Sequence, residues 1–266
     1  MANILNVKNL RVHFRNAAPD RWAVGGVSFS IGEGEILGLV GESGSGKTVT
    51  AMCCSGLLLR KKAVLEGEVT VNDREMLHCS DKELRSIQGD ELAVVFQEPM
   101  TSMDPLMRIG PQIEEALRVH TKLTPAQRKA RALEVLAMVE LDDPEGVYRK
   151  YPHELSGGML QRCMIAAAII NRPKLLLADE PTTALDVTIQ GQILELLKKL
   201  NAETGMAILF ISHNLQVVRK LCDRVAVMQG GRIVEEGHVE DIFRAPKHEY
   251  TKRLIAAIPT RDKKLT

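Results

Sequence analysis

The sequence has few aromatic residues, only 3% of its 266 positions, and almost no net charge. Its 35 Lys and Arg residues nearly balance 34 Asp and Glu residues, which gives a formal net charge of +1. Nucleic-acid-binding domains usually carry a basic surface, and single strands are usually held by stacked aromatic rings. The composition therefore argues against a nucleic-acid partner and against a general attraction to anionic membranes.

Long hydrophobic runs are also missing. No apolar stretch approaches the roughly 20 residues that a membrane-spanning helix needs. Near the N-terminus, Asn3, Asn6 and Lys8 interrupt the sequence before a signal-peptide core could form. A function at a membrane would therefore depend on a partner protein.

Cysteines are few and show no metal-site or disulfide spacing. None forms a C-x-x-C pair, and the five are Cys53, Cys54, Cys79, Cys163 and Cys222. We predict reduced core thiols in a cytosolic protein.

Apolar residues are abundant. They make up 45% of the sequence, which is enough to fill a sizeable core. Short apolar or β-branched runs recur as "ILNVKNL", "VSFSI", "EILGLV", "EVTVND", "LAVVF", "LLLAD", "AILFIS", "RVAVM" and "RIVEEG". Several are almost continuously hydrophobic, which is typical of strands buried on both faces of a largely parallel sheet. After Asp186, apolar residues recur at three- and four-residue spacing, at Ile189, Ile193, Leu196, Leu197 and Leu200. This spacing predicts a helix packed on a core, and so an α/β architecture.

Between "LAVVFQ" and "LLLADE" the composition changes. Residues 98–158 are rich in Met, Pro and charge, with helix-like segments over 109–120 and 124–141. Thr124 is a plausible N-cap for the second, because Pro125 follows at the first helical position. This stretch indicates a helical insertion in the α/β core.

The most specific local motif is "GESGSGKT", Gly41–Thr48, which fits G-x-x-x-x-G-K-[ST] between a strand-like and a helix-like segment. Glycines allow backbone N–H groups to surround an anion, and a helix N-terminus adds partial positive charge. Lys47 can reach the β- and γ-phosphates, and the Thr48 hydroxyl can ligate Mg²⁺. A glycine-rich turn with an incidental lysine is the alternative.

Acidic and polar residues follow other predicted strands. In "LLLADE", Asp179 is placed to hold Mg²⁺ and Glu180 to polarise an attacking water, unless the two acids merely solvate a strand end. His213 follows "AILFIS" and could donate to a γ-phosphate, although a histidine there is more often structural. Gln97 ends "LAVVFQ", where an amide is usually a turn residue.

Taken together, these motifs resemble the ATP-binding subunits of ABC transporters. The order of Gly41–Thr48, Gln97, "LSGGMLQR", "LLLADEP", "ALD" and "SHN" matches that family, and the resemblance extends over essentially the whole chain. It implies one ABC ATPase domain over 1–266, with an N-terminal antiparallel β subdomain. The nucleotide-binding core would be 1–97 and 159–235, the helical subdomain 98–158, and a short C-terminal extension 236–266.

The resemblance also assigns residue roles. ATP would be bound by Phe14, Gly41, Glu42, Ser43, Gly44, Ser45, Gly46, Lys47, Thr48, Gln97 and Asp179. Of these, Thr48, Gln97 and Asp179 would hold Mg²⁺. Glu180 would be the general base and His213 the switch histidine, with Gln97 and Lys47 also catalytic. Phe14 would stack on adenine, with Trp22 as the competing candidate.

In proteins of this family, two ATPase subunits pack head to tail. Each signature segment then caps the nucleotide on the other subunit, which implies contacts in trans from Ser156, Gly157, Gly158, Gln161 and Asp186. ATP would favour the closed dimer, and hydrolysis would remove the γ-phosphate contacts.

Several runs resemble the ATPase subunits of bacterial peptide and nickel importers, including "FQEPMTSMDPLMRIGPQIEEAL" and "APKHEYTKRLIAAIP". The expected partners are a second ATPase subunit, identical or related, two membrane permeases and, indirectly, an extracytoplasmic solute-binding protein. The expected place is the cytoplasmic face of the inner membrane. Many relatives continue into a cysteine-containing tail, whereas this sequence ends at Thr266, so we expect no iron–sulfur site. Asn214 departs from the Asp that usually follows the switch histidine.

The sequence argues against two other functions. A soluble ABC ATPase acting as a clamp on DNA or ribosomes would usually carry a long coiled-coil insertion or two ATPase halves, and neither is present. A regulator that binds ATP without hydrolysis would lack the base or the histidine, yet Glu180 and His213 are both there.

Overall fold

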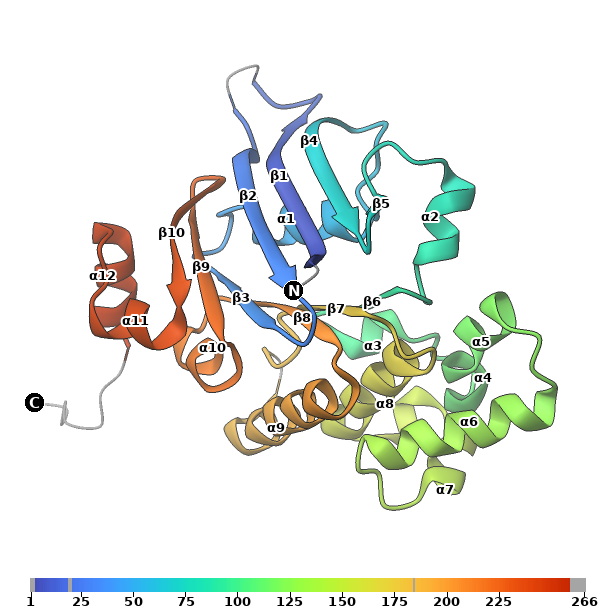
Figure 1. The fold of residues 1–266 in the computed structure, drawn as a ribbon. Coiled ribbons are helices and arrows are strands. Elements are labelled where there is room, and N and C mark those ends of the chain that lie inside the picture. Colours follow the sequence, from blue (N-terminus) through green and yellow to red (C-terminus); the bar gives the residue numbers. More distant parts are fainter. Residues whose placement is uncertain (1–2, 19–20, 184, 259–266) are drawn as a thin grey trace, which may run out of the picture.

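The computed structural model describes residues 3–18, 21–183 and 185–258, arranged as two sheets and a group of helices (Figure 1). The antiparallel sheet lies on one side of the six-stranded sheet. Helices α4–α7 gather at one end of the molecule, and α11 and α12 lie at the other (Figure 1). The C-terminal residues 259–266, part of the expected extension, lie outside the described residues.

The first sheet has the strand order β2-β1-β4-β5. Its strands are β1 (Asn3–Phe14), β2 (Val24–Gly32), β4 (Ala63–Val71) and β5 (Arg74–Glu75). β1 pairs antiparallel with both β2 and β4, so this is the antiparallel β subdomain expected from the family resemblance.

The second sheet has the order β10-β9-β3-β8-β7-β6. It consists of β3 (Ile36–Val40), β6 (Leu92–Val95), β7 (Leu175–Asp179), β8 (Ala207–Ser212), β9 (Arg224–Gln229) and β10 (Arg232–His238). All neighbours pair in parallel except β9 and β10. The carboxyl ends of β3, β6, β7 and β8 therefore meet at one edge, where ligands of parallel α/β sheets usually bind.

The continuous hydrophobic runs are explained by burial on both faces of this sheet. In β7, Leu175 and Leu177 pack in the core shared with the antiparallel sheet and α1 (Lys47–Cys54), whereas Leu176 and Ala178 pack in the core shared with the helices. Because neighbouring strand residues point to opposite faces, a strand between two cores needs apolar residues throughout.

The helical insertion consists of short elements. These are α3 (Pro99–Ser102), α4 (Ile109–Ile113), α5 (Glu115–His120), α6 (Pro125–Met138) and α7 (Pro144–Arg149), followed by a 3₁₀ turn (Pro152–Glu154). Thr124 caps α6 by accepting a hydrogen bond from the Gln127 amide, as predicted. The single segment expected over 109–120 is instead two helices that meet at Glu114.

The remaining helices are α2 (Asp81–Ile87), α8 (Gly157–Ile169), α9 (Val187–Thr204), α10 (Leu215–Leu221), α11 (Val239–Arg244) and α12 (Glu249–Ala256). The predicted apolar stripe lies on α9, where Ile193, Leu196, Leu197 and Leu200 are buried and Ile189 is half-buried. The predicted α/β class with an inserted helical subdomain is therefore confirmed. All five cysteines are free thiols, and four of them are buried. No helix within the described ranges is long and apolar enough to cross a membrane.

Candidate nucleotide-binding site

Residues from widely separated segments meet in one cavity at the carboxyl edge of the parallel sheet. The cavity has a volume of about 1370 Å³, enough for a nucleotide and surrounding water. Its lining includes most of the loop 41–48 and the residues expected to act around a phosphate, namely Lys47, Thr48, Gln97, Glu180 and His213. Phe14 and Trp22 line it as well. The fold thus gathers residues that the sequence only placed after separate strands.

Glycines are required in the loop 41–48 because the backbone passes close to its neighbours. A Cβ on Gly41 would lie 2.1 Å from the Met228 carbonyl oxygen. Gly46 has a φ of +105° and is the N-cap of α1, where a Cβ would meet the Ala23 carbonyl at 2.7 Å. The loop therefore closes tightly over the start of α1, where Lys47 and Thr48 line the cavity. The free N–H groups of a helix N-terminus favour an anion.

Lys47 is turned back onto its own loop. Its Nζ donates to the carbonyl oxygens of Gly41 at 2.8 Å and Glu42 at 3.0 Å, and the residue is only 5% exposed. Burial lowers the pKa of Lys47, whereas the negative charges of Glu180 and Asp179 act in the opposite direction. A buried ammonium held mainly by neutral carbonyls gains from an anionic partner, and a phosphate would supply one.

Asp179 ends β7 with an unsatisfied oxygen. Its Oδ1 atom is buried without a hydrogen-bond partner. Burial, and then the charge of Glu180, raise the pKa of Asp179, whereas a hydrogen bond from Thr48 and the charge of Lys47 lower it less. A buried carboxylate beside a hydroxyl suits Mg²⁺, which commonly takes one or two protein oxygens and completes its shell with water and phosphate. The residues present therefore fit a nucleotide-bound magnesium ion.

Glu180 is held in an uncommon backbone conformation, with a φ of +47°. Its N–H donates to the Ile211 carbonyl of β8 at 3.0 Å. Its Oε2 atom lies 2.9 Å from the Thr183 hydroxyl, 3.0 Å from His213 Nδ1 and 3.4 Å from Gln97 Nε2. A residue that adopts a strained backbone while three polar groups converge on its carboxylate is a candidate for catalysis.

Asn214 stabilises the segment that follows His213. Its side chain accepts a hydrogen bond from the Gln216 amide at 2.9 Å and caps α10. Asn and Asp are about equally good N-caps, so the departure from the usual Asp preserves the local structure. His213 itself is exposed to the cavity.

Both candidate aromatic residues lie at the β-subdomain end of the cavity. Trp22 already has partners, since the Arg11 guanidinium carbon lies 4.2 Å from its ring centroid and the His13 ring meets it edge-on at 5.5 Å. Phe14 lines the cavity, and among the described residues no other ring or cation stacks on it. Either ring is placed to meet a base, and one face of Trp22 is already covered.

Comparison with known proteins shows the family to which this chain belongs. The profile of the ABC transporter family matches residues 24–183, more than half of the sequence. The chain belongs to the ABC transporter family. It is an ATP-binding, ATP-hydrolysing subunit of that family, in agreement with the cavity just described.

Two relatives extend the similarity over almost the whole chain. A dipeptide transport ATP-binding protein of Haemophilus influenzae is 47% identical over 256 residues, which are 96% of this chain and 78% of the relative. An oligopeptide transport ATP-binding protein of Bacillus subtilis is 45% identical over 261 residues, 98% of this chain and 73% of the relative.

A solved structure has a similar fold. It is the dimeric post-hydrolysis state of an ATP-binding cassette bound to ADP and Pi, which is 32% identical with a TM-score of 0.77. The alignment covers 88% of this chain and 98% of the solved one.

The ABC signature segment lies apart from the cavity. Ser156 is exposed and caps α8 by accepting a hydrogen bond from the Met159 amide. Gly157 and Gly158 form the first turn of α8, and a Cβ on Gly158 would lie 2.9 Å from Ile189 of α9. None of these three residues lines the cavity that contains Lys47. The exposed start of α8 is thus free to meet a nucleotide held elsewhere.

Asp186 and Gln161, the other two residues expected to act in trans, differ in their exposure to solvent. Asp186 is exposed and caps α9 by accepting hydrogen bonds from the Thr188 and Ile189 amides. Gln161 is 1% exposed, and its buried Nε2 has no hydrogen-bond partner. A contact between Gln161 and a nucleotide on another subunit would require this side chain to leave the interior, so we do not include it in the proposed contact set.

Thr183 is one cavity residue that sequence reasoning missed. Its hydroxyl lies 2.9 Å from Glu180 Oε2, and the residue lines the cavity. Thr183 follows Glu180 by three residues, in a turn closed by the hydrogen bond from the Thr183 amide to the Glu180 carbonyl. This short spacing is the feature of the sequence that could have indicated Thr183 as a site residue.

Proposed function

We propose that the cavity binds Mg²⁺–ATP and hydrolyses it to drive import through a membrane transporter. The observation that carries this proposal is the convergence of Lys47, Glu180 and His213 on one cavity at the carboxyl edge of the parallel sheet. Asp179 ends the same strand beside Glu180, and its charge acts on Lys47. Phosphoryl transfer needs these groups together, because catalysis rests on positioning and charge stabilisation.

On binding ATP, Lys47 exchanges two neutral carbonyl partners for phosphate oxygens. The N–H groups at the start of α1 face the same phosphates, with support from the helix dipole. Thr48, Asp179 and Gln97 are the residues that would hold Mg²⁺, an ion that neutralises charge on the phosphates. Phe14 is our candidate for stacking on adenine, because Arg11 already covers one face of Trp22.

Glu180 is the proposed general base. The three groups around its Oε2 atom fix the direction of the carboxylate, which lies beside the phosphate loop in the same cavity. In that position it would accept a proton from the attacking water. His213 would orient Glu180 and stabilise charge that develops on the γ-phosphate.

The exposed start of α8 supports a site shared between two subunits. Ser156 and the N–H groups of Gly157 and Gly158 would cap the γ-phosphate bound by a second subunit, and Asp186 would lie at the same interface. The similar cassette solved as a dimer with ADP and Pi supports this arrangement. The second subunit is an identical or a related ATPase chain.

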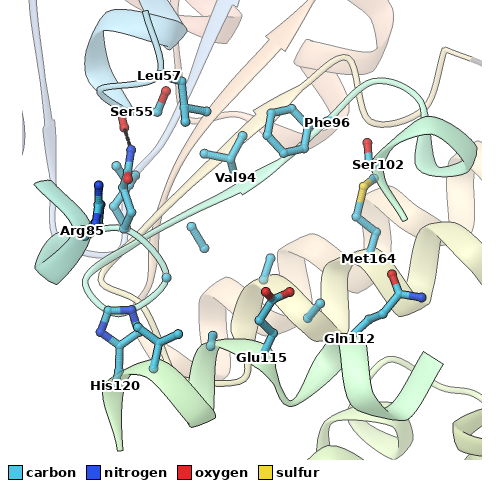
Figure 2. A pocket seen from close by; sticks show the side chains of 18 of the residues that line it. Ser55, Leu57, Arg85, Val94, Phe96, Ser102, Gln112, Glu115, His120 and Met164 are labelled. Carbon is cyan, nitrogen blue, oxygen red and sulfur yellow. Dashed lines mark hydrogen bonds between the residues drawn. The ribbon is translucent and has the colours of Figure 1, made fainter. Parts of the chain in front are cut away.

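A groove on another face is our candidate for binding the membrane subunit. Figure 2 shows side chains from the helical insertion facing those of the core across this groove. The volume of the groove is about 550 Å³. Apolar Leu57, Phe96 and Val119 are 41%, 44% and 68% exposed there, and Glu115, Arg85 and His120 add polar groups. Exposed apolar side chains flanked by polar ones are typical of a docking site for an amphipathic helix.

Phe96 also links this groove to the cavity, because the next residue is Gln97, whose amide contacts Glu180. A permease segment in the groove would thereby sense the nucleotide state. We therefore propose that the chain works at the cytoplasmic face of the inner membrane, peripheral to two permeases, with a solute-binding protein outside delivering the cargo.

Peptides are the proposed cargo, because two relatives that match almost the whole chain are named for dipeptide and oligopeptide transport. The test is ATP hydrolysis by the transporter reconstituted with its permeases and solute-binding protein. We expect hydrolysis to be stimulated by short peptides and not by Ni²⁺. Stimulation by Ni²⁺ alone would assign the transporter to nickel uptake instead.

A further inference from the structure

The C-terminal helix α12 reaches the phosphate loop through one hydrogen bond. The hydroxyl oxygen of Tyr250 accepts from the backbone N–H of Glu42 at 2.9 Å, across 208 residues of sequence. Tyr250 is 3% exposed and belongs to the main hydrophobic core. Leu254, one turn later on α12, lines the nucleotide cavity. The helix is therefore part of the wall of the site, although no phosphate-loop motif includes it.

Tyr250 is held in place by contacts to β10. The carboxylate of Glu235 accepts hydrogen bonds from the amides of Lys247 at 2.7 Å and His248 at 3.0 Å. His248 Nδ1 then accepts from the Tyr250 amide at 3.2 Å and caps α12. Because the start of the helix is fixed to the sheet, the Tyr250 hydroxyl is a rigid acceptor.

The peptide unit that Tyr250 contacts is the one that Lys47 uses. The N–H of Glu42 and the C=O of Gly41 belong to the same planar peptide group. In this structure the C=O accepts from Lys47 Nζ at 2.8 Å while the N–H donates to Tyr250. The peptide plane is therefore held at both ends, next to a glycine whose backbone lies close to Met228.

Nucleotide binding would change only one of these two hydrogen bonds. If Lys47 turned to the phosphates, the Gly41 carbonyl would lose its ammonium partner, and the hydrogen bond to Tyr250 would still fix this peptide plane. A loop whose shape is already set does not lose conformational freedom when the anion binds, and this increases affinity.

We propose that Tyr250 is a positioning residue of the phosphate loop, which makes nucleotide affinity depend on the C-terminal helix. This inference rests on the proposed function, since it assumes that the loop binds ATP. Tyr250 does not touch the reacting atoms, so its removal is expected to affect binding more than the chemical step.

Tyr250→Phe tests the proposal because it removes only the hydroxyl. Losing one hydrogen bond to a backbone N–H predicts a roughly three- to ten-fold rise in the dissociation constant for a fluorescent ATP analogue. The KM for ATP should rise similarly, while kcat at saturating ATP stays within about two-fold of wild type.

Tyr148→Phe is the matched control. The Tyr148 hydroxyl donates to buried Glu114 at 2.5 Å in the helical insertion and does not contact the phosphate loop. This variant should lower the melting temperature and leave the dissociation constant for the ATP analogue at the wild-type value. The comparison separates loss of stability from loss of loop positioning.

The outcomes distinguish the inference from the proposed function. If wild type binds the analogue and Tyr250→Phe binds it equally well, the positioning role is wrong and the proposed function stands. The role is also wrong if both variants weaken binding in proportion to their loss of thermal stability. If wild type itself does not bind the analogue, the proposed function fails.

Discussion

The Nδ1 atom of His213 lies 3.0 Å from the Oε2 atom of Glu180. These residues follow the neighbouring parallel strands β8 and β7, so strand pairing brings them together across 33 positions of sequence. Thr183 and Gln97 approach the same oxygen, and the carboxylate direction is therefore set by residues from three segments. We interpret this cluster as the part of the site that aligns the base.

His213→Ala should impair hydrolysis and spare binding. The variant removes the closest imidazole from Glu180 and a donor that could stabilise developing charge, so we expect the rate of phosphate release to fall about 10²- to 10³-fold. Binding of an ATP analogue should stay near the wild-type value, because the hydrogen bond of His213 is to Glu180, whereas Lys47 contacts the phosphate loop. His78→Ala removes an exposed histidine elsewhere in the sequence and is the control. It should change neither the rate of phosphate release nor the binding of the ATP analogue.

Lys47→Ala should weaken nucleotide binding itself. The change removes a charge-assisted contact to phosphate, which corresponds to a roughly 10- to 100-fold rise in the dissociation constant for ATP. Lys61→Ala, at an exposed lysine, is the control of equal charge. Wild-type affinity in Lys47→Ala, measured by isothermal titration calorimetry, would show that the loop 41–48 does not bind the phosphates.

Asp179→Asn should stabilise the nucleotide-free protein. Burial raises the pKa of Asp179 above its value in the unfolded chain, so its ionisation lowers the free energy of unfolding as pH rises through the folded pKa. The amide removes that cost, and we expect the melting temperature at neutral pH to rise by roughly 2 to 4 °C, the shift that ~1 kcal/mol produces in a domain of this size.

The stability difference between Asp179→Asn and wild type should depend on pH. Below the unfolded pKa both states of wild type are protonated at this position, so the difference between Asp179→Asn and wild type should be small near pH 4 and larger at pH 8. Asp90→Asn, at an exposed aspartate, is the matched control. A difference that shrinks with rising pH in thermal melts would contradict the buried-carboxylate interpretation. Magnesium-dependent ATP binding should weaken in Asp179→Asn alone.

Ser156→Arg tests whether the signature acts on another subunit. Ser156 is exposed and does not line the cavity of its own chain, so an arginine there should leave ATP binding by the monomer within about two-fold of wild type. Hydrolysis should be abolished, because the bulky side chain blocks the cap on the partner's nucleotide. Equal loss of binding and hydrolysis would indicate that the signature acts within one chain.

The strands and the site were largely predictable because their signals are local. Strand burial on two faces gave continuous apolar runs, and parallel strands bring their carboxyl ends to one edge, so Asp179 and His213 were expected near Lys47. The N-cap at Thr124 was equally local. The antiparallel sheet could be expected only from the resemblance to ABC subunits, since strand direction leaves no mark in such short segments.

Other features depend on contacts that the sequence does not encode locally. The segment 109–120 breaks into α4 and α5 at Glu114, a buried carboxylate within reach of Arg118, Arg128 and Tyr148. Helix α1 ends at Cys54, just before Gly56, which adopts a φ of +67°. The burial of Gln161 and the bond from Glu42 to Tyr250 likewise follow from tertiary packing.

The account depends most on Glu180 as the base at a site that binds ATP. The most direct measurement is phosphate release by Glu180→Gln, made at matched occupancy with bound ATP and compared with wild type and with exposed Glu203→Gln. We predict that Glu180→Gln retains ATP, accumulates an ATP-dependent dimer and releases phosphate at least about 100-fold more slowly, while Glu203→Gln behaves as wild type. Unchanged phosphate release by Glu180→Gln would contradict the account.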